Sequence, residues 1–214
     1  MPILVLATLN DHKVEELRHS LTAKLPRWEL QGAKKYLGPR RWSEVGLSFR
    51  ENAQLKAEFV RAHCKHWVLS DDSGLEIAAL AGLPGVNSSS WGGEEGNHAK
   101  NNEKLVAQMR NQTNMHARFV CTLCLISPTG KIHFFDGECA GLISVDAKGQ
   151  KGFGYDPHFI PAGFSKSMAE LTPDEKNQIS HRGKALEKLE AFLQKLAPSA
   201  VFVAANVISF FSIK

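Results

Sequence analysis

The opening segment of the chain places the strongest constraint on its fold. Residues Ile3 to Ala7 form an apolar run of β type, and Val14, Leu17 and Leu21 then repeat with helical spacing. The polar turn Thr8-Leu9-Asn10-Asp11 separates the two segments. A strand, a loop and a helix in this order predict an α/β fold.

The next segments alternate in the same way. Ser48 and Glu51 fit a capping box for a second helix over Phe49 to Cys64. A short strand, Trp67 to Ser70, is expected to end in the turn Asp71-Asp72-Ser73-Gly74. The Gly-, Ser- and Pro-rich segment from Gly82 to Gly96 is predicted to be a long loop and a candidate lid, followed by a helix that includes Leu105, Val106 and Met109.

Antiparallel pairing is expected further along the chain. Arg118 to Ile126 and Lys131 to Phe135 are β runs joined by the turn Ser127-Pro128-Thr129-Gly130, and a further strand is expected around Gly141 to Val145. Thr172-Pro173-Asp174-Glu175 marks a helix start, and Ser180 is expected to cap another helix. The fold class predicted is therefore α/β, with a mixed central β-sheet flanked by helices.

Composition narrows the class of protein. A chain of 214 residues with 43% hydrophobic and 22% charged residues is typical of a globular protein, and its length allows two lobes around a cleft. The net charge of +4 is spread along the chain, which favours a small anionic ligand over nucleic acid. The N-terminus does not resemble a signal peptide, so we expect a cytoplasmic protein.

The chain contains an apolar C-terminal segment and four cysteines. The apolar segment Val201 to Ile213 is too short to cross a bilayer, and no membrane association is expected. The cysteines Cys64, Cys121, Cys124 and Cys139 do not form paired CxxC motifs. Cys121 and Cys124 should lie on opposite faces of a strand, and all four are interpreted as reduced packing residues.

Two groups of residues could handle phosphate and metal. Thr8, Asn10 and Lys13 lie where a strand meets a helix, a setting that favours an anion, although polar turns of this kind are common on surfaces. Asp71 and Asp72 offer carboxylate oxygens that suit Mg²⁺ and could activate water. Strand parity would let one of them face a cleft while the other bonds backbone in a turn; a turn without chemistry is the alternative.

Two later groups could enclose a base. In Gly152-Phe153-Gly154-Tyr155-Asp156-Pro157, Phe153 or Tyr155 offers an aromatic face and Asp156 an acceptor, although such turns also simply close β elements. Lys176 with His181 and Arg182 brings cations to a helix start, where they could bind phosphate or read carbonyl oxygens; a solvated helix face is the alternative.

In this order the motifs resemble the inosine triphosphate pyrophosphatase family, the non-canonical purine NTP pyrophosphatases. The resemblance covers about Met1 to Leu196, which would form one domain with two lobes around a nucleotide-binding cleft, and leaves residues 197–214 as an apolar tail. The blocks that carry it are Ala7-Thr8-Leu9-Asn10 with Lys13, Glu51-Asn52-Ala53 with Lys56-Ala57, Ser70 to Leu75, Pro84-Gly85, Gly152 to Pro157, and Lys176 with Ile179 to Gly183.

The resemblance implies hydrolysis of ITP, dITP and XTP to the monophosphate and pyrophosphate. Asp72 would bind Mg²⁺ and accept a proton from the attacking water, and Glu44 would be a second metal ligand. The other implied contacts are with substrate, through Thr8, Asn10, Lys13, Ser73, Phe153, Gly154, Tyr155, Asp156, Lys176, His181 and Arg182. A homodimer is implied as well.

Two departures from the family pattern leave other functions open. Leu9 replaces a glycine of the family's Thr-Gly-Asn turn, and Asn87-Ser88-Ser89-Ser90 replaces its Tyr-Ser-Ala-Arg. A nucleotide-binding protein without catalysis is one alternative, and a phosphohydrolase of broader specificity is another.

Overall fold

The computed structural model describes residues 1–9, 11–22, 24–43 and 45–196. In this part of the chain six strands form one mixed sheet in the order β2-β1-β3-β4-β5-β6. β1 pairs in parallel with β2 and β3, and the remaining pairs are antiparallel. The strands are β1 (Ile3–Leu6), β2 (Glu29–Gly32), β3 (Trp67–Ile77), β4 (His116–Ile126), β5 (Ile132–Ile143) and β6 (Phe159–Pro161).

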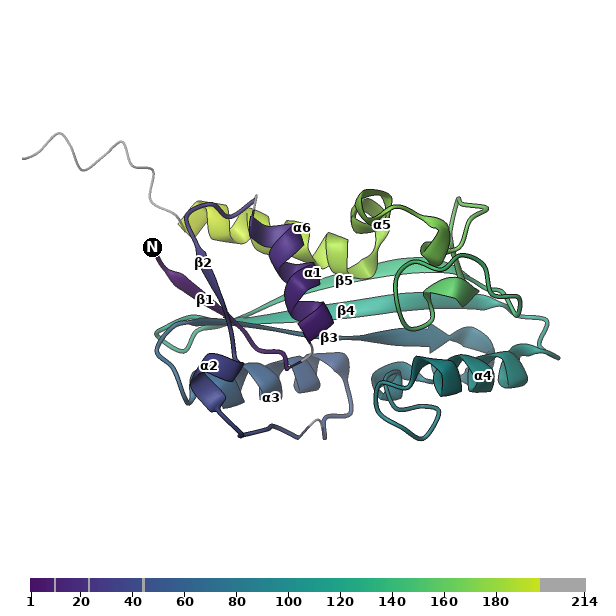
Figure 1. The fold of residues 1–214 in the computed structure, drawn as a ribbon, viewed down its shortest axis with the longest axis horizontal. Helices are drawn as coiled ribbons and strands as arrows, with labels where there is room; N and C mark the ends of the chain where they lie inside the picture. Colours follow the sequence, from purple (N-terminus) through teal and green to yellow (C-terminus); the bar gives the residue numbers. More distant parts are fainter. Residues whose placement is uncertain (10, 23, 44, 197–214) are drawn as a thin grey trace, which may run out of the picture.

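Helices cover both faces of this sheet. Figure 1 shows α1, α5 and α6 above the strands and α2, α3 and α4 below them. Their bounds are α1 (Asp11–Thr22), α2 (Lys34–Leu37), α3 (Phe49–Arg61), α4 (His98–Met109), α5 (Pro173–Ile179) and α6 (His181–Leu196). The prediction of a mixed sheet flanked by helices is confirmed. No helix in the described ranges is long and apolar enough to cross a membrane.

The periodic residues of α1 and α6 form one core with the sheet. Leu17 and Leu21 of α1 and Leu189 of α6 are at most 2% exposed and pack with Leu4 and Leu6 of β1. Full burial of a leucine side chain contributes about 1.5–3 kcal/mol. This apolar contact packs α1 and α6 on the same face of the sheet.

The opposite face packs on α3. Ala53, Ala57 and Val60 of α3 are fully buried against Val68 of β3. Cys124 belongs to this core, whereas Cys121 belongs to the core on the α6 side, as strand parity predicted. All four cysteines are buried and free, in agreement with their interpretation as packing residues.

Capping chemistry agrees with the helix starts. Thr172 and Glu175 form a complete capping box at α5, and the Ser180 hydroxyl accepts the Gly183 N–H at 3.0 Å in the first turn of α6. At α3, the Ser48 hydroxyl accepts the Glu51 N–H at 3.2 Å. The second half of the predicted box is wrong, because the Glu51 carboxylate accepts the N–H of Leu47 instead.

The predicted strands and helices need three corrections. β3 does not end at Ser70 but continues to Ile77, because Asp71 to Gly74 pair residue by residue with β4. The two strands predicted within residues 131–145 are one continuous strand, β5. β2, α2 and β6 were not predicted, since each spans four residues or fewer and carries no readable periodicity.

Candidate active site

One cavity of about 610 Å³ collects the candidate residues. The predicted site residues Asn10 and Glu44 lie outside the described part of the chain, as does the tail of residues 197–214. Every other predicted site residue lines the cavity, namely Thr8, Lys13, Asp72, Ser73, Phe153, Gly154, Tyr155, Asp156, Lys176, His181 and Arg182. The fold thus brings four separate sequence motifs to one place.

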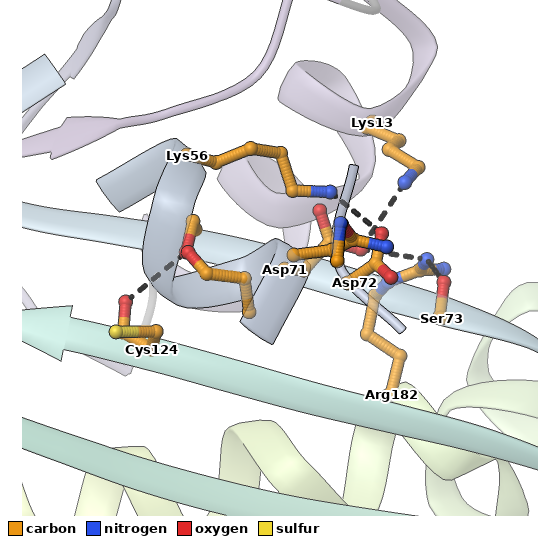
Figure 2. Close-up of polar contacts among 11 residues, drawn as sticks. Lys13, Lys56, Asp71, Asp72, Ser73, Cys124 and Arg182 are labelled. Atoms are coloured by element: carbon orange, nitrogen blue, oxygen red, sulfur yellow. Dashed lines mark hydrogen bonds and ion pairs between the residues drawn. The ribbon is translucent and has the colours of Figure 1, made fainter. Parts of the chain in front are cut away.

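Asp72 lies on the face of β3 that meets α3. Its side chain is almost fully buried, and its Oδ1 accepts a hydrogen bond from Lys56 Nζ at 2.6 Å (Figure 2). Ser70, two residues earlier on the same face, donates to the carbonyl of Ala53 in α3. Asp72 therefore places a carboxylate at the cavity wall, and Lys56 places an ammonium group directly against this carboxylate.

Lys56 is a site residue that sequence reasoning missed. The motif blocks included it, but no role was assigned to it. The sequence did indicate a buried position for Lys56, because it occupies the same helical stripe as Phe49, Ala53 and Val60, which are buried. A lysine in an apolar stripe requires a partner for its charge, and here that partner is Asp72.

Asp71 points to the opposite face of β3. Its Oδ2 lies 3.0 Å from Arg182 Nη2 and 3.4 Å from Lys13 Nζ. Burial alone would raise the pKa of Asp71, but Lys13, Arg182 and Lys56 together outweigh it and hold the pKa well below its usual range. The expectation that one aspartate bonds backbone in a turn is wrong, because the strand continues and both carboxylates meet cations.

The glycine-aromatic turn forms another wall of the cavity. Gly152 and Gly154 have φ values of 77° and 64°, which favour glycine. The Asp156 carboxylate accepts the Phe153 N–H at 2.8 Å and Lys176 Nζ at 2.7 Å. Asp156 thereby fixes the turn and orients Lys176.

The two aromatic residues of this turn have different surroundings. The Tyr155 hydroxyl donates to the Ser88 carbonyl at 2.8 Å, and burial raises the pKa of Tyr155. Phe153 is 40% exposed at the cavity, with Lys176 Nζ 5.0 Å from its ring centroid. Of the two, Phe153 is therefore the residue with an aromatic face available for stacking.

His181 is held in the first turn of α6 by close packing. A Cβ atom on Gly137 of β5 would collide with the His181 carbonyl, so glycine allows the start of α6 to lie on the sheet. The imidazole stacks on Phe119 with ring centroids 4.9 Å apart and an interplanar angle of 14°. Burial, followed by the charges of Arg182 and Lys176, lowers the pKa of His181 well below its ordinary value. The ring is therefore neutral near pH 7, with one donor and one acceptor nitrogen.

The loop from Gly82 to Gly96 is tied to its surroundings. Asn101 of α4 donates to the carbonyl of Ser89 at 3.0 Å and accepts the N–H of Gly92 at 2.6 Å. The Ser88 hydroxyl accepts the Leu75 N–H at 2.9 Å. The prediction of a loop is confirmed, and these bonds anchor the candidate lid at several points.

The departure at Leu9 is accommodated without left-handed backbone. Among the described residues, Ala81 is the one non-glycine residue with a positive φ, so Leu9 keeps an ordinary conformation. Its side chain is partly buried against the core beside α3 and also reaches the cavity. Leu9 therefore replaces the flexibility of glycine with an apolar contact.

The donor chemistry of the cavity fits a hard cation that is bound mainly through a substrate. Asp72 supplies carboxylate oxygen, whereas Asp71 is engaged by two cations. In the described ranges no group of three or more His, Cys, Asp or Glu side chains could hold a metal ion. Mg²⁺ commonly uses one or two carboxylates together with phosphate oxygens and water, so Asp72 fits such a site.

Comparison with known proteins agrees with the motifs. The Ham1 family model matches residues 4–192. A dITP/XTP pyrophosphatase of Exiguobacterium sp. is 45% identical, covering 88% of this chain and 95% of the relative. One from Protochlamydia amoebophila is 41% identical, covering 90% and 98%.

A solved structure gives the same result. The Ham1 protein of Staphylococcus aureus superposes with a TM-score of 0.83 at 35% identity, covering 91% of this chain and 99% of that one. The match therefore extends over most of both chains. The family resemblance predicted from the motifs is confirmed, and the chain belongs to the Ham1 family.

Proposed function

We propose that this protein is a nucleoside-triphosphate pyrophosphatase that hydrolyses dITP, ITP and XTP to the monophosphate and pyrophosphate. The observation that carries the proposal is the buried carboxylate of Asp72 in a cavity that Lys13, Lys176 and Arg182 also line. Cations at the cavity suit a polyphosphate, and a carboxylate suits the activation of water. Relatives over 40% identical that are named dITP/XTP pyrophosphatases support the substrate class.

The proposed chemistry is the reaction that the family resemblance implies. Water attacks the α-phosphorus and the bond to the pyrophosphate group breaks, so that no covalent intermediate with the protein is required. Asp72 accepts the proton of the attacking water, and Lys56 holds the Asp72 carboxylate in place through its 2.6 Å contact. Lys13 and Arg182 offset the negative charge that grows on the departing oxygens.

Mg²⁺ is the cofactor that we propose for this site. Asp72 would hold it, with Glu44 as the proposed second protein ligand. When bound, Mg²⁺ supplies positive charge to the phosphate oxygens. Thr8, Asn10 and Ser73 complete the proposed contacts with the substrate.

The base is proposed to bind against the glycine-aromatic turn. Phe153 would stack on the purine, and Gly154 allows the backbone to approach it closely. The neutral imidazole of His181, together with Arg182 and Lys176, would donate to a 6-keto oxygen. Adenine carries an amino group at that position, where a donor is unfavourable.

We propose that the chain has a two-lobed domain and forms a homodimer. Residues 1–196 would form one domain with two lobes around the nucleotide cleft. A separate core that includes Leu105, Met109 and Phe159 supports the second lobe. The family resemblance favours a homodimer, and we also propose a cytoplasmic location because the N-terminal sequence does not resemble a signal peptide.

A substrate panel tests this function. With Mg²⁺ present, pyrophosphate release from ITP, dITP and XTP should far exceed release from ATP, and Asp72→Asn should abolish it. Equal rates for ITP and ATP would contradict the specificity. Thermal stabilisation by ITP without product would instead favour a binding protein, because ligand binding to the native state raises stability without turnover.

A further inference from the structure

Asp71 is a buried anion that the proposed reaction does not use. It is 2% exposed and adjacent in sequence to Asp72, yet its side chain lies on the opposite face of β3. A buried carboxylate beside a phosphate site opposes the binding of an anion. We therefore expect Asp71 to have a structural role that offsets this unfavourable effect on anion binding.

The contacts of Asp71 join two helices. Lys13 comes from α1 and Arg182 from α6, and both cations approach the same oxygen, Oδ2, at 3.4 Å and 3.0 Å (Figure 2). Arg182 Nη2 also donates to the Ser73 hydroxyl at 3.0 Å. The guanidinium group therefore spans two side chains on one face of β3.

The charges are unequal in number. Two cations face one carboxylate, so Asp71 reduces their mutual repulsion and leaves this group of three side chains with net positive charge. Arg182 is almost fully buried and Lys13 is 23% exposed, so Lys13 has more room to move toward solvent. An anchor on Lys13 keeps its ammonium group beside Arg182.

We infer that Asp71 is a positioning residue that holds Lys13 and Arg182 together as one anion-binding unit. In the proposed function, Lys13 and Arg182 offset the negative charge on the phosphate oxygens of the substrate. Asp71 then fixes these two cations relative to each other. It acts through the two cations and does not touch the substrate.

Binding of inorganic tripolyphosphate tests this inference, because the two explanations predict opposite signs. If Asp71 only adds negative charge, Asp71→Asn will tighten tripolyphosphate binding. If Asp71 positions the cations, the same substitution will weaken binding by about tenfold, since preorganisation is lost. Titration calorimetry in EDTA gives the affinity, and tighter or unchanged binding would overturn the inference. Glu138→Gln, at an exposed carboxylate that pairs with Arg118, is the control and should leave binding unchanged.

A stability cycle tests the same contacts without any ligand. Asp71→Asn should lower the Tm of the wild-type protein, because it removes the partner of two cations. In a Lys13→Met/Arg182→Met background it should raise the Tm, because it removes a buried charge that has lost both ion-pair partners. A fall in Tm of equal size in both backgrounds would refute the inference that Asp71 holds Lys13 and Arg182 together.

The outcomes separate this inference from the proposed function on which it rests. If Asp71→Asn weakens tripolyphosphate binding but the wild-type protein does not hydrolyse ITP, the proposed function fails and the role of Asp71 stands. If ITP is hydrolysed and Asp71→Asn does not weaken tripolyphosphate binding, the inference fails and the proposed function stands.

Discussion

Replacing Lys56 with methionine removes the ammonium group beside Asp72 while keeping an unbranched side chain. Lys56 and Asp72 are 3% and 6% exposed, and their ion pair measures 2.6 Å. Loss of one partner of a buried pair destabilises a protein by about 3–5 kcal/mol. Lys24 provides the control, because its 3.1 Å pair with Glu190 lies at the surface and Lys24→Met should change stability by less than about 1 kcal/mol.

Urea unfolding in EDTA near neutral pH measures these differences. The double variant Lys56→Met/Asp72→Asn removes the charge that the single change leaves behind, and should recover at least about 2 kcal/mol. The reasoning is refuted if Lys56→Met is as stable as Lys24→Met. It is also refuted if the double variant is less stable than Lys56→Met, because Asp72 would then not depend on Lys56.

Three further changes probe other parts of the site. Phe153→Ala should raise the KM for ITP by about tenfold through lost stacking, and a change below about twofold in steady-state kinetics would contradict that role. Tyr155→Phe removes the buried bond to the Ser88 carbonyl and should lower stability by about 1 kcal/mol in urea unfolding; an unchanged midpoint would contradict this. Because the pKa of His181 lies well below 6.5, the unfolded chain binds a proton that the folded protein does not. Stability should therefore fall as pH decreases below 6.5, by up to about 1.4 kcal/mol per unit, and a slope in His181→Gln equal to that of the wild type would contradict this.

Local signals predicted the helices other than α2 and many of the residues that line the cavity. The Thr172 to Glu175 capping box could be read because all its bonds lie within three residues of each other. The spacing of Val14, Leu17 and Leu21 similarly reflects one side of a single helix. The motifs that line the cavity were recognisable because each is a compact block in the sequence.

Partners across long sequence separations could not be predicted in this way. Asp71 to Gly74 have the composition of a turn, but pairing with β4 extends the strand through them. The shared contact of Lys13 and Arg182 with Asp71 depends on how α1 and α6 pack over the sheet. A role for Lys56 could have been predicted, since a charged side chain in the buried stripe of α3 requires a buried partner.

Isotope labelling tests the central claim most directly. Hydrolysis of ITP in ¹⁸O-labelled water, with Mg²⁺ present, should place the label in inosine monophosphate and leave pyrophosphate unlabelled, because water attacks the α-phosphorus. Asp72→Asn should abolish this incorporation. Label in pyrophosphate, or release of labelled phosphate as the first product, would contradict the account.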